Sequence, residues 1–168
     1  LYPSSVLVGR GAHSESLSVI LAGAGQIQDV GAKAIHLAPD TTSIIRSKSI
    51  SKDGGVSNYR GLVKVGKRAE NSVSSMECDA LILDEGSDSN TYPAVETKHN
   101  KVQIAHEARV GKIGDKEIFY LKSRGFSEEE AVRLIVNGFI KPVVKSLPLE
   151  YALELNKLIE LELESSVS

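Results

Sequence analysis

Short runs of aliphatic and β-branched residues alternate with turn-forming residues along the first two thirds of the chain. The clearest runs are residues 6–8, 17–21, 34–37, 62–65 and 81–83. Glycine, proline and aspartate separate these runs at intervals of about 12 to 18 residues, which is typical of strand, turn and strand in repetition. The pattern predicts an all-β region over residues 1–113.

Hydrophobic and polar side chains alternate most clearly late in this region. The residues that share one face of the expected strand are Val102, Ile104, His106, Ala108 and Val110. No segment of the region keeps the spacing of an amphipathic helix for three turns. Two architectures remain open from the pattern alone: a sandwich or barrel of antiparallel hairpins, and a parallel β-helix of stacked coils.

The last third of the chain contains residues that typically begin and end helices. Ser127 and Glu130 have the spacing of a capping box, in which each side chain bonds the backbone N–H of the other residue at the start of a helix. Gly138 is expected to end that helix, and Pro142 and Pro148 each suit the first turn of a new one. The sequence therefore predicts several short helices over residues 114–168.

The final segment, residues 149–164, is amphipathic and acidic. One side of the expected helix carries Ala152, Leu153, Asn156, Leu158, Ile159 and Leu163. Glutamate and lysine occupy the other side. The apolar stripe either packs on the chain's own helices or binds a partner, and the pattern leaves both interpretations open.

Composition and charge limit the classes of function that this chain can have. The chain of 168 residues is 41% hydrophobic and 25% charged, which is ordinary for one globular domain. Its formal net charge of -2 and its scattered basic residues give no general attraction for nucleic acid or an anionic membrane. No apolar run reaches the roughly 20 residues that span a bilayer, and the start lacks a signal-peptide pattern, so we expect a cytoplasmic protein. Because the first residue is Leu1, we expect the sequence to be part of a longer chain.

Cys78 is the one cysteine of the sequence, which excludes an internal disulfide and any metal site made of this chain's cysteines alone. Strand alternation places it on a face with Met76 and Ala80, so an inert core thiol is one interpretation. Glu77 and Asp79 beside it would oppose formation of the thiolate, unless a metal ion or another cation lies nearby. A metal-bound thiolate is the second interpretation.

His106 and Glu107 form a His-Glu pair, but consecutive side chains of a strand point to opposite faces. Either one of the two binds a metal ion while the other supports it, or the strand is irregular at this point. We expect the remaining histidines, His13, His36 and His99, to be structural or exposed to solvent.

Common catalytic signatures are absent from the sequence. It contains no Gly-x-Ser-x-Gly elbow, no Gly-x-x-x-x-Gly-Lys phosphate loop and no His-Glu-x-x-His zinc helix. The aromatic content of 5%, without tryptophan, is poor for stacking sugars and argues against a carbohydrate-active β-helix enzyme. The candidate chemistry is therefore confined to Cys78 and the His-Glu pair.

Several ordered motifs carry a resemblance to a known family. They are Asn-Tyr-Arg-Gly-Leu-Val at 58–63, Cys-Asp at 78–79, Leu-Ile-Leu-Asp at 81–84, Asn-Thr-Tyr-Pro at 90–93, His-Glu-Ala at 106–108, Phe-Tyr at 119–120, Arg-Gly-Phe at 124–126 and Ile-Val-Asn-Gly-Phe at 135–139. With these motifs the chain closely resembles the C-terminal part of the SufB/SufD family of iron–sulfur cluster assembly proteins, and SufB more than SufD. The resemblance implies a right-handed parallel β-helix over residues 1–113 and a C-terminal helical domain over residues 114–168.

The resemblance also implies roles for three residues. Cys78 falls at the SufB cysteine implicated in receiving sulfur and building the cluster, where SufD typically lacks a cysteine. His106 and Glu107 match the end of the family's Glu-His-Glu segment, whose first acid is replaced by Ala105 here. The expected ligands of iron and of a transient iron–sulfur cluster are therefore Cys78, His106 and Glu107. No cofactor is expected on this chain in isolation.

The resemblance implies a scaffold that works with partners, and not an enzyme. A SufC-like ATPase is expected on the C-terminal helices, and a SufD-like paralogue or a second copy on the β-helix. A sulfur donor is the third expected partner, and neither nucleic acid nor a membrane is expected. The departure at Ala105 leaves an alternative open, a SufD-like structural subunit in which Cys78 is inert.

Overall fold

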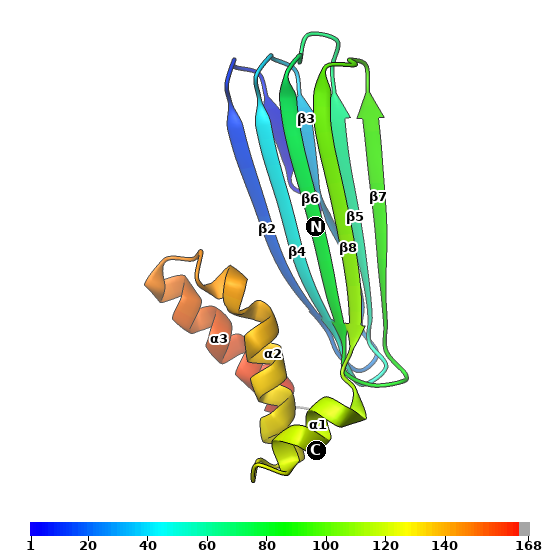
Figure 1. Cartoon of the computed structure of the whole chain (residues 1–168), viewed down its shortest axis with the longest axis vertical. Coiled ribbons are helices and arrows are strands. Elements are labelled where there is room, and N and C mark those ends of the chain that lie inside the picture. The colour runs from blue at the N-terminus through cyan, green and yellow to red at the C-terminus, as the bar shows by residue number, and fades with distance from the viewer. Residues whose placement is uncertain (165–168) are drawn as a thin grey trace.

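The fold is a parallel β-solenoid followed by three helices (Figure 1). The computed structural model describes residues 1–164. The strands are β1 (Ser4–Leu7), β2 (His13–Ala22), β3 (Ile27–His36), β4 (Thr42–Ser51), β5 (Val56–Val65), β6 (Ser72–Ile82), β7 (Asp88–Thr97) and β8 (Val102–Lys112). The helices are α1 (Asp115–Lys122), α2 (Glu128–Val144) and α3 (Leu149–Glu164).

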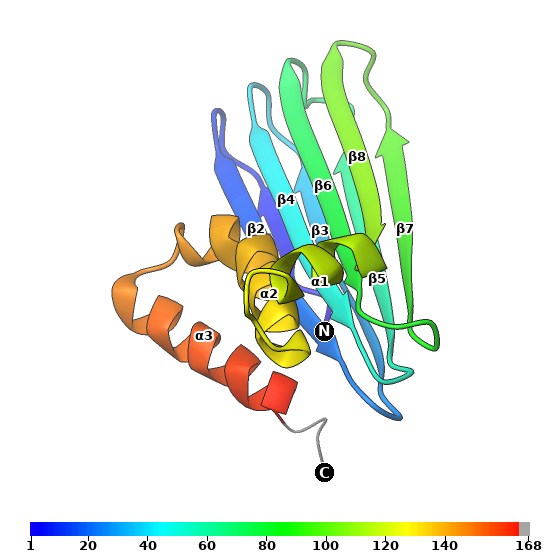
Figure 2. The ribbon, with the colours of Figure 1, turned by 60° about the horizontal axis from the view of Figure 1, so that its bottom comes forward.

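The strand pairings within residues 1–164 are all parallel, and they build two sheets. Sheet A has the order β1-β3-β5-β7 and sheet B the order β2-β4-β6-β8. Consecutive strands therefore alternate between the sheets, and each coil contributes one strand to each (Figures 1 and 2). This arrangement confirms the parallel β-helix and excludes the antiparallel sandwich or barrel.

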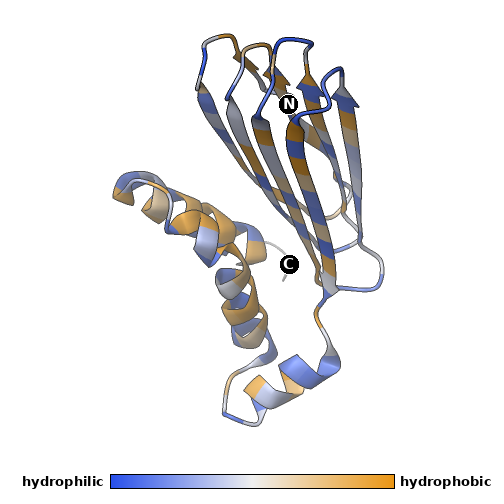
Figure 3. Cartoon of the chain, turned by 45° about the horizontal axis from the view of Figure 1, so that its top comes forward, coloured by the Kyte–Doolittle hydropathy of each residue, from blue (hydrophilic) through white to orange (hydrophobic). Residues whose placement is uncertain are grey.

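Equivalent positions of successive coils lie directly beside one another. Ser47 on β4 pairs with Cys78 on β6, and Cys78 pairs with Ala108 on β8, in a register that is unbroken along these strands. Figure 3 shows the alternation of hydrophobic and hydrophilic positions along the strands. Because alternate side chains point inward, the interior consists of rows of residues that stack from coil to coil.

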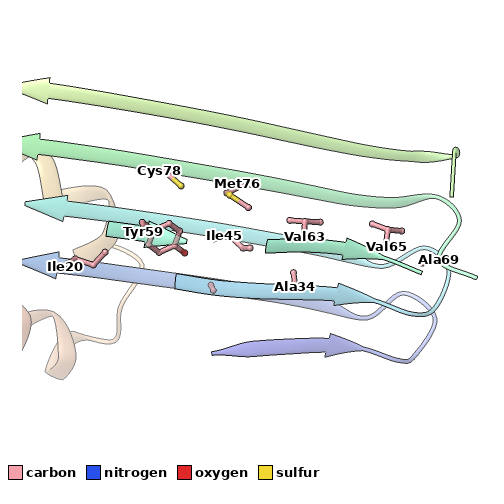
Figure 4. Close-up of a cluster of buried hydrophobic side chains, with 10 residues drawn as sticks. Ile20, Ala34, Ile45, Tyr59, Val63, Val65, Ala69, Met76 and Cys78 are labelled. Atoms are coloured by element: carbon pink, nitrogen blue, oxygen red, sulfur yellow. The ribbon is translucent and has the colours of Figure 1, made fainter. Parts of the chain in front are cut away.

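The centre of the interior is apolar and closely packed. Its buried members are Ile20, Ala32, Ala34, Ile45, Tyr59, Val63, Val65, Ala69, Met76 and Cys78 (Figure 4). Gly61 on β5 faces the side chain of Met76, and a Cβ atom at position 61 would lie 2.5 Å from the Met76 sulfur. The two sheets are thus held together by contacts between inward rows, with little room for added volume.

A hydrogen-bonded polar ladder continues the interior beside this apolar centre. The ring of His36 bonds Thr41 Oγ1 through Nδ1 at 2.8 Å and Ser43 Oγ through Nε2 at 2.9 Å. Thr41 and Ser43 bond Ser72 and Ser74 of the next coil, each at 2.8 Å. The buried polar groups therefore satisfy one another, as burial requires. Desolvation lowers the pKa of His36.

Helix α2 packs against the outer face of sheet B. Its start is capped as predicted, because the Ser127 hydroxyl accepts from the Glu130 N–H at 3.1 Å and the Glu130 carboxylate accepts from the Ser127 N–H at 2.7 Å. The buried apolar residues shared by sheet B, α2 and α3 are Ile50, Leu81, Val136, Ile140 and Ile159. This second cluster fixes the helices to the solenoid.

Helix α2 is longer than the sequence predicts. The prediction that Gly138 ends it and Pro142 begins another helix is wrong, because both residues lie inside α2. Ile140 and Val143, on either side of Pro142, are buried. Tertiary burial thus keeps the last turns helical although proline lacks an N–H. Pro148 does precede a new helix, and its carbonyl accepts from the Ala152 N–H at 3.0 Å.

Much of the apolar surface of the helices stays exposed. Ile159 on α3 is buried, whereas Leu153 and Leu158 of the same stripe are 63% and 54% exposed. Phe119 on α1 is 74% exposed. Packing within the chain therefore accounts for only part of the amphipathic pattern. Among residues 1–164, no helix combines the length and the apolar character needed to cross a membrane.

The close approach of β3 and β5 gives a test of the fold. A methyl group at Gly31 would overlap the backbone carbonyl oxygen of Arg60 on the neighbouring strand. We expect Gly31→Ala to lower the free energy of unfolding by about 2 kcal/mol or more, because backbone must move to make room. Gly138→Ala, at an open position inside α2, should raise it by about 0.5–1 kcal/mol. Urea denaturation measures both, and a neutral Gly31→Ala would contradict the pairing of β3 with β5.

The buried ring of His36 predicts a loss of stability in acid. Its pKa in the folded chain lies below the ordinary value of 6.5, so the unfolded chain binds the proton first as the pH falls. This contribution to stability is complete above pH 6.5 and declines as the pH falls from there through the lowered folded pKa. Denaturation at several pH values should show this dependence, and His36→Gln should reduce it while His13→Gln, at an exposed position, leaves it unchanged. An unaltered pH dependence in His36→Gln would contradict the assignment.

Candidate functional site

Cys78 lies at the middle of β6 and points into the solenoid. Its neighbours on the strand, Glu77 and Asp79, point outward, as the alternation predicts. The Cys78 side chain is 3% exposed and stands in one row with Ser47 on β4 and Ala108 on β8. One coil, made of β7 and β8, therefore separates this thiol from the end of the solenoid.

The surroundings of Cys78 favour the neutral thiol. Burial is the main cause that raises its pKa, and the charge of Asp79 adds to this effect. A hydrogen bond with Ser47 acts in the opposite direction. Formation of a thiolate at this position therefore needs a bound cation or further hydrogen-bond donors.

His106 on β8 lies on the same interior face as Cys78. It pairs with Met76, two residues before Cys78 on β6, so the two candidate residues are diagonal neighbours on adjacent strands. Diagonal neighbours of a sheet lie roughly 7–8 Å apart, within reach of an imidazole and a thiolate that share one ion or cluster. His106 is exposed because β8 is the last strand of sheet B. The structure thus brings these two residues together.

Glu107 lies on the opposite, outer face of β8. Its carboxylate accepts from Arg109 Nε at 3.0 Å and lies 2.7 Å from Arg109 Nη2. This hydrogen bond raises the pKa of Arg109. Strand β8 pairs without a bulge along its length, so nothing turns Glu107 toward Cys78. Within residues 1–164, no three histidine, cysteine or acidic side chains are grouped so that they could hold a metal ion.

A charged groove between sheet B and α2 was not expected from the sequence. Lys48 Nζ donates to Asp79 Oδ2 at 2.5 Å in a pair that is largely buried, and the same Nζ lies 4.6 Å from the centre of the Phe139 ring. Arg46 on β4 lies 2.5 Å from Glu15 Oε1 and 3.5 Å from Glu77 Oε2. The groove is lined by Leu17, Arg46, Ser47, Lys48, Glu77, Asp79, Arg109, Pro142, Val143 and Ser146. These pairs hold the outer face behind Cys78 in place.

Tyr59 is the buried residue that the sequence reasoning missed. It is 2% exposed on β5 and belongs to the same interior cluster as Cys78. Its hydroxyl has no hydrogen-bond partner, and among residues 1–164 it is the one buried side-chain polar atom in that condition. Alternation along β5 places Tyr59 inward with Ser57 and Val63. The sequence pattern therefore indicates a tyrosine in the core.

Comparison with known proteins assigns a family to the chain. The family model described as SUF system FeS cluster assembly, SufBD core domain, matches residues 1–139. The chain is 53% identical to the iron–sulfur cluster assembly protein SufB of Bacillus subtilis over 166 residues, which are 99% of this chain and 36% of that protein. SufBD family iron–sulfur cluster assembly proteins of Staphylococcus saprophyticus and Staphylococcus aureus are 53% and 52% identical over the same shares.

The chain spans 36% of the length of these curated relatives. The matched range, residues 1–139, includes the solenoid together with Cys78, His106 and Glu107. Fold, motifs and similarity agree, and the chain belongs to the SufB/SufD family of iron–sulfur cluster assembly proteins of the SUF system.

Proposed function

We propose that this chain belongs to a SufB-like scaffold subunit that acts in the cytoplasm, receives sulfur and iron, builds an iron–sulfur cluster at a subunit interface and passes it on. The observation that carries the proposal is the shared interior face of Cys78 and His106 beside the end of the solenoid. A thiolate and an imidazole are ligands that suit iron in such clusters. The similarity to a protein named SufB supports the same assignment.

A partner subunit would complete the ligand set. Cys78 and His106 supply two ligands, and the described residues offer no group of three. Strands β7 and β8 end their sheets, so their outer edges carry backbone groups to which another sheet can add. A SufD-like paralogue or a second copy bound there would cover both side chains and contribute the remaining ligands. Ligands shared between subunits suit a cluster destined for transfer, because separation of the subunits releases it.

Glu107 has a supporting role in this proposal. Its carboxylate pairs with Arg109 on the outer face, where it stabilises β8 from the side opposite to His106. A stable β8 holds the His106 imidazole in one direction. Residues around the ligands of a metal site commonly orient those ligands in this way. A direct bond from Glu107 to iron would require β8 to lose its regular pairing at this point.

The exposed apolar residues of the helices suit a protein partner. Phe119, Leu153 and Leu158 are each more than half exposed, and exposed apolar surface of this kind marks interaction sites. We assign this surface to the SufC-like ATPase, whose cycle would open the interface above Cys78. A sulfur donor would reach the thiol in the opened state.

A SufD-like structural role is the alternative function. The burial of Cys78, the raised pKa of its thiol and the absence of an acid at Ala105 favour it. In that role Cys78 fills the core and the chain supports assembly and ATPase binding without touching the cluster.

Reconstitution separates the two roles. We expect Cys78→Ala, in the protein at its native length with its partners, to reduce bound iron and visible cluster absorbance by about 10-fold or more after anaerobic addition of iron and sulfide. His106→Ala should also reduce them, because it removes the second interior ligand. Glu107→Ala should have the smallest effect of the three, since its carboxylate faces outward.

Gln103→Ala, at an exposed position of β8, is the matched control for disturbance of the edge strand. Circular dichroism of each variant checks that the solenoid is intact. Full cluster occupancy in Cys78→Ala would refute the scaffold role of Cys78 and favour the SufD-like role. A loss in Glu107→Ala equal to that in Cys78→Ala would refute the assignment of Glu107 to a supporting role.

The burial of Cys78 predicts that its access depends on the partner's cycle. In the complex without nucleotide, maleimide should label Cys78 slowly, because its side chain is 3% exposed. Addition of ATP should accelerate labelling by about 10-fold or more if opening exposes the last coil. Mass spectrometry of the labelled peptide gives the rate at this thiol. A rate that is the same with and without ATP would contradict opening at this site.

A further inference from the structure

Helix α3 is attached to the rest of the chain by few buried side chains. Among residues 149–163, Ile159 is the one buried residue, and Leu155 and Leu163 are partly buried beside it. The buried residues of α2, a helix of similar length, are Ala131, Val136, Ile140 and Val143. Figures 1 and 2 show α2 between sheet B and α3. Because a helix of 16 residues is only marginally stable in water by itself, α3 depends on these few contacts.

A buried lysine of the solenoid reaches the end of α3. Lys52 lies directly after β4, and its side chain is 7% exposed. Its Nζ donates to the backbone carbonyl of Glu162, in the last turn of α3, and lies 3.6 Å from Asp53 Oδ2. Carbonyl groups of a last helical turn lack partners within the helix and form the negative end of its dipole. A cation that donates to one of them therefore stabilises this end of the helix.

The backbone and the stem of Lys52 are fixed within the solenoid. Its N–H donates to the Ala22 carbonyl at 2.9 Å, and its own carbonyl accepts from the Gly55 N–H at 2.9 Å. The stem lies against Gly23 of the preceding coil, where an added Cβ atom would be 3.7 Å from Lys52 Cε. The ammonium group is thus carried by a rigid part of the chain, and a movement of α3 away from the solenoid would break its bond to the helix.

A cleft is present where the end of α3 meets α2 and the solenoid. Leu83, Val132 and Leu163 line it beside Lys52. These apolar side chains leave space unfilled, so they lose part of the contact that close packing would give them. The hydrogen bond from Lys52 therefore has a larger share in holding this end of α3 than it would have in a closely packed interface.

We propose that α3 is a strap that opens and closes as one unit, and that Lys52 is the latch that holds it closed. Segments with few buried contacts are the ones that open locally in native proteins, and residues 145–148 before α3 would be the hinge. Opening uncovers Leu155, Ile159 and Leu163 together with the part of the apolar cluster that they cover. The strap thus sets how much apolar surface the helices present. The inference goes beyond the proposed function and does not depend on a bound cluster.

Hydrogen exchange followed by mass spectrometry, on the protein at its native length, tests the strap and the latch. In the unchanged protein we expect the amides of α3 to exchange together, about 10-fold or more faster than those of α2. Lys52→Met keeps the apolar stem and removes the charged donor. It should accelerate exchange in α3 by about a further 10-fold and leave α2 and the strands unchanged. Lys52→Arg, which keeps a charged donor, should change exchange in α3 less than Lys52→Met.

Lys48→Met is the matched control, because Lys48 is also a largely buried lysine of β4 but contacts Asp79 on β6 and Phe139 on α2. It should not accelerate exchange in α3 more than in α2. Exchange in α3 as slow as in α2, measured in the unchanged protein, would overturn the strap, and this comparison needs no variant to fold. Exchange in Lys52→Met that is unchanged in α3, or accelerated equally in α2 and α3, would overturn the latch.

Discussion

The parallel register between coils is the constraint on which the rest of this structure depends. It places each inward residue beside its equivalents in the neighbouring coils, so that the row of Ser47, Cys78 and Ala108 forms without any local motif. The same register supplies the partners of the buried polar ladder and holds the two sheets against one apolar centre. A shift of one residue would turn every inward side chain outward, which is why the interior tolerates so little change.

The stacking of inward rows stops at the β7–β8 end of the solenoid. Inward residues of an inner coil are covered by a coil on each side. Those of the last coil, β7 and β8, are covered on one side only. His106 is exposed for that reason, and Cys78 is protected by one coil only. In the function that we propose, a partner completes a site at this end and opens it on leaving. The helices that follow keep apolar residues exposed, and this is the surface that we propose for a second partner.

Part of this arrangement could be predicted from the sequence, because strand alternation is a local property. Alternation alone places Cys78 on a face with Met76 and Ala80 and sets His106 and Glu107 on opposite faces of their strand, as the structure confirms. The shared interior face of Cys78 and His106 depends on the register between β6 and β8, which alternation does not give. Local patterns could not decide between parallel coils and antiparallel hairpins, because the residues that pair are a whole coil apart in the sequence. The family resemblance was needed to decide between them. Burial beside Pro142 overrode the local signals that should have ended α2. The missing partner of Tyr59 depends on side chains from strands of several coils, which no local pattern records.

We propose that iron is held from the interior face, by Cys78 and His106 together with ligands of a partner subunit. X-ray absorption at the iron edge, measured on the loaded complex, tests it most directly. We expect a mixed sulfur and nitrogen environment around iron that loses a thiolate in Cys78→Ala and an imidazole in His106→Ala. An iron environment identical in the unchanged complex and in both variants would contradict it.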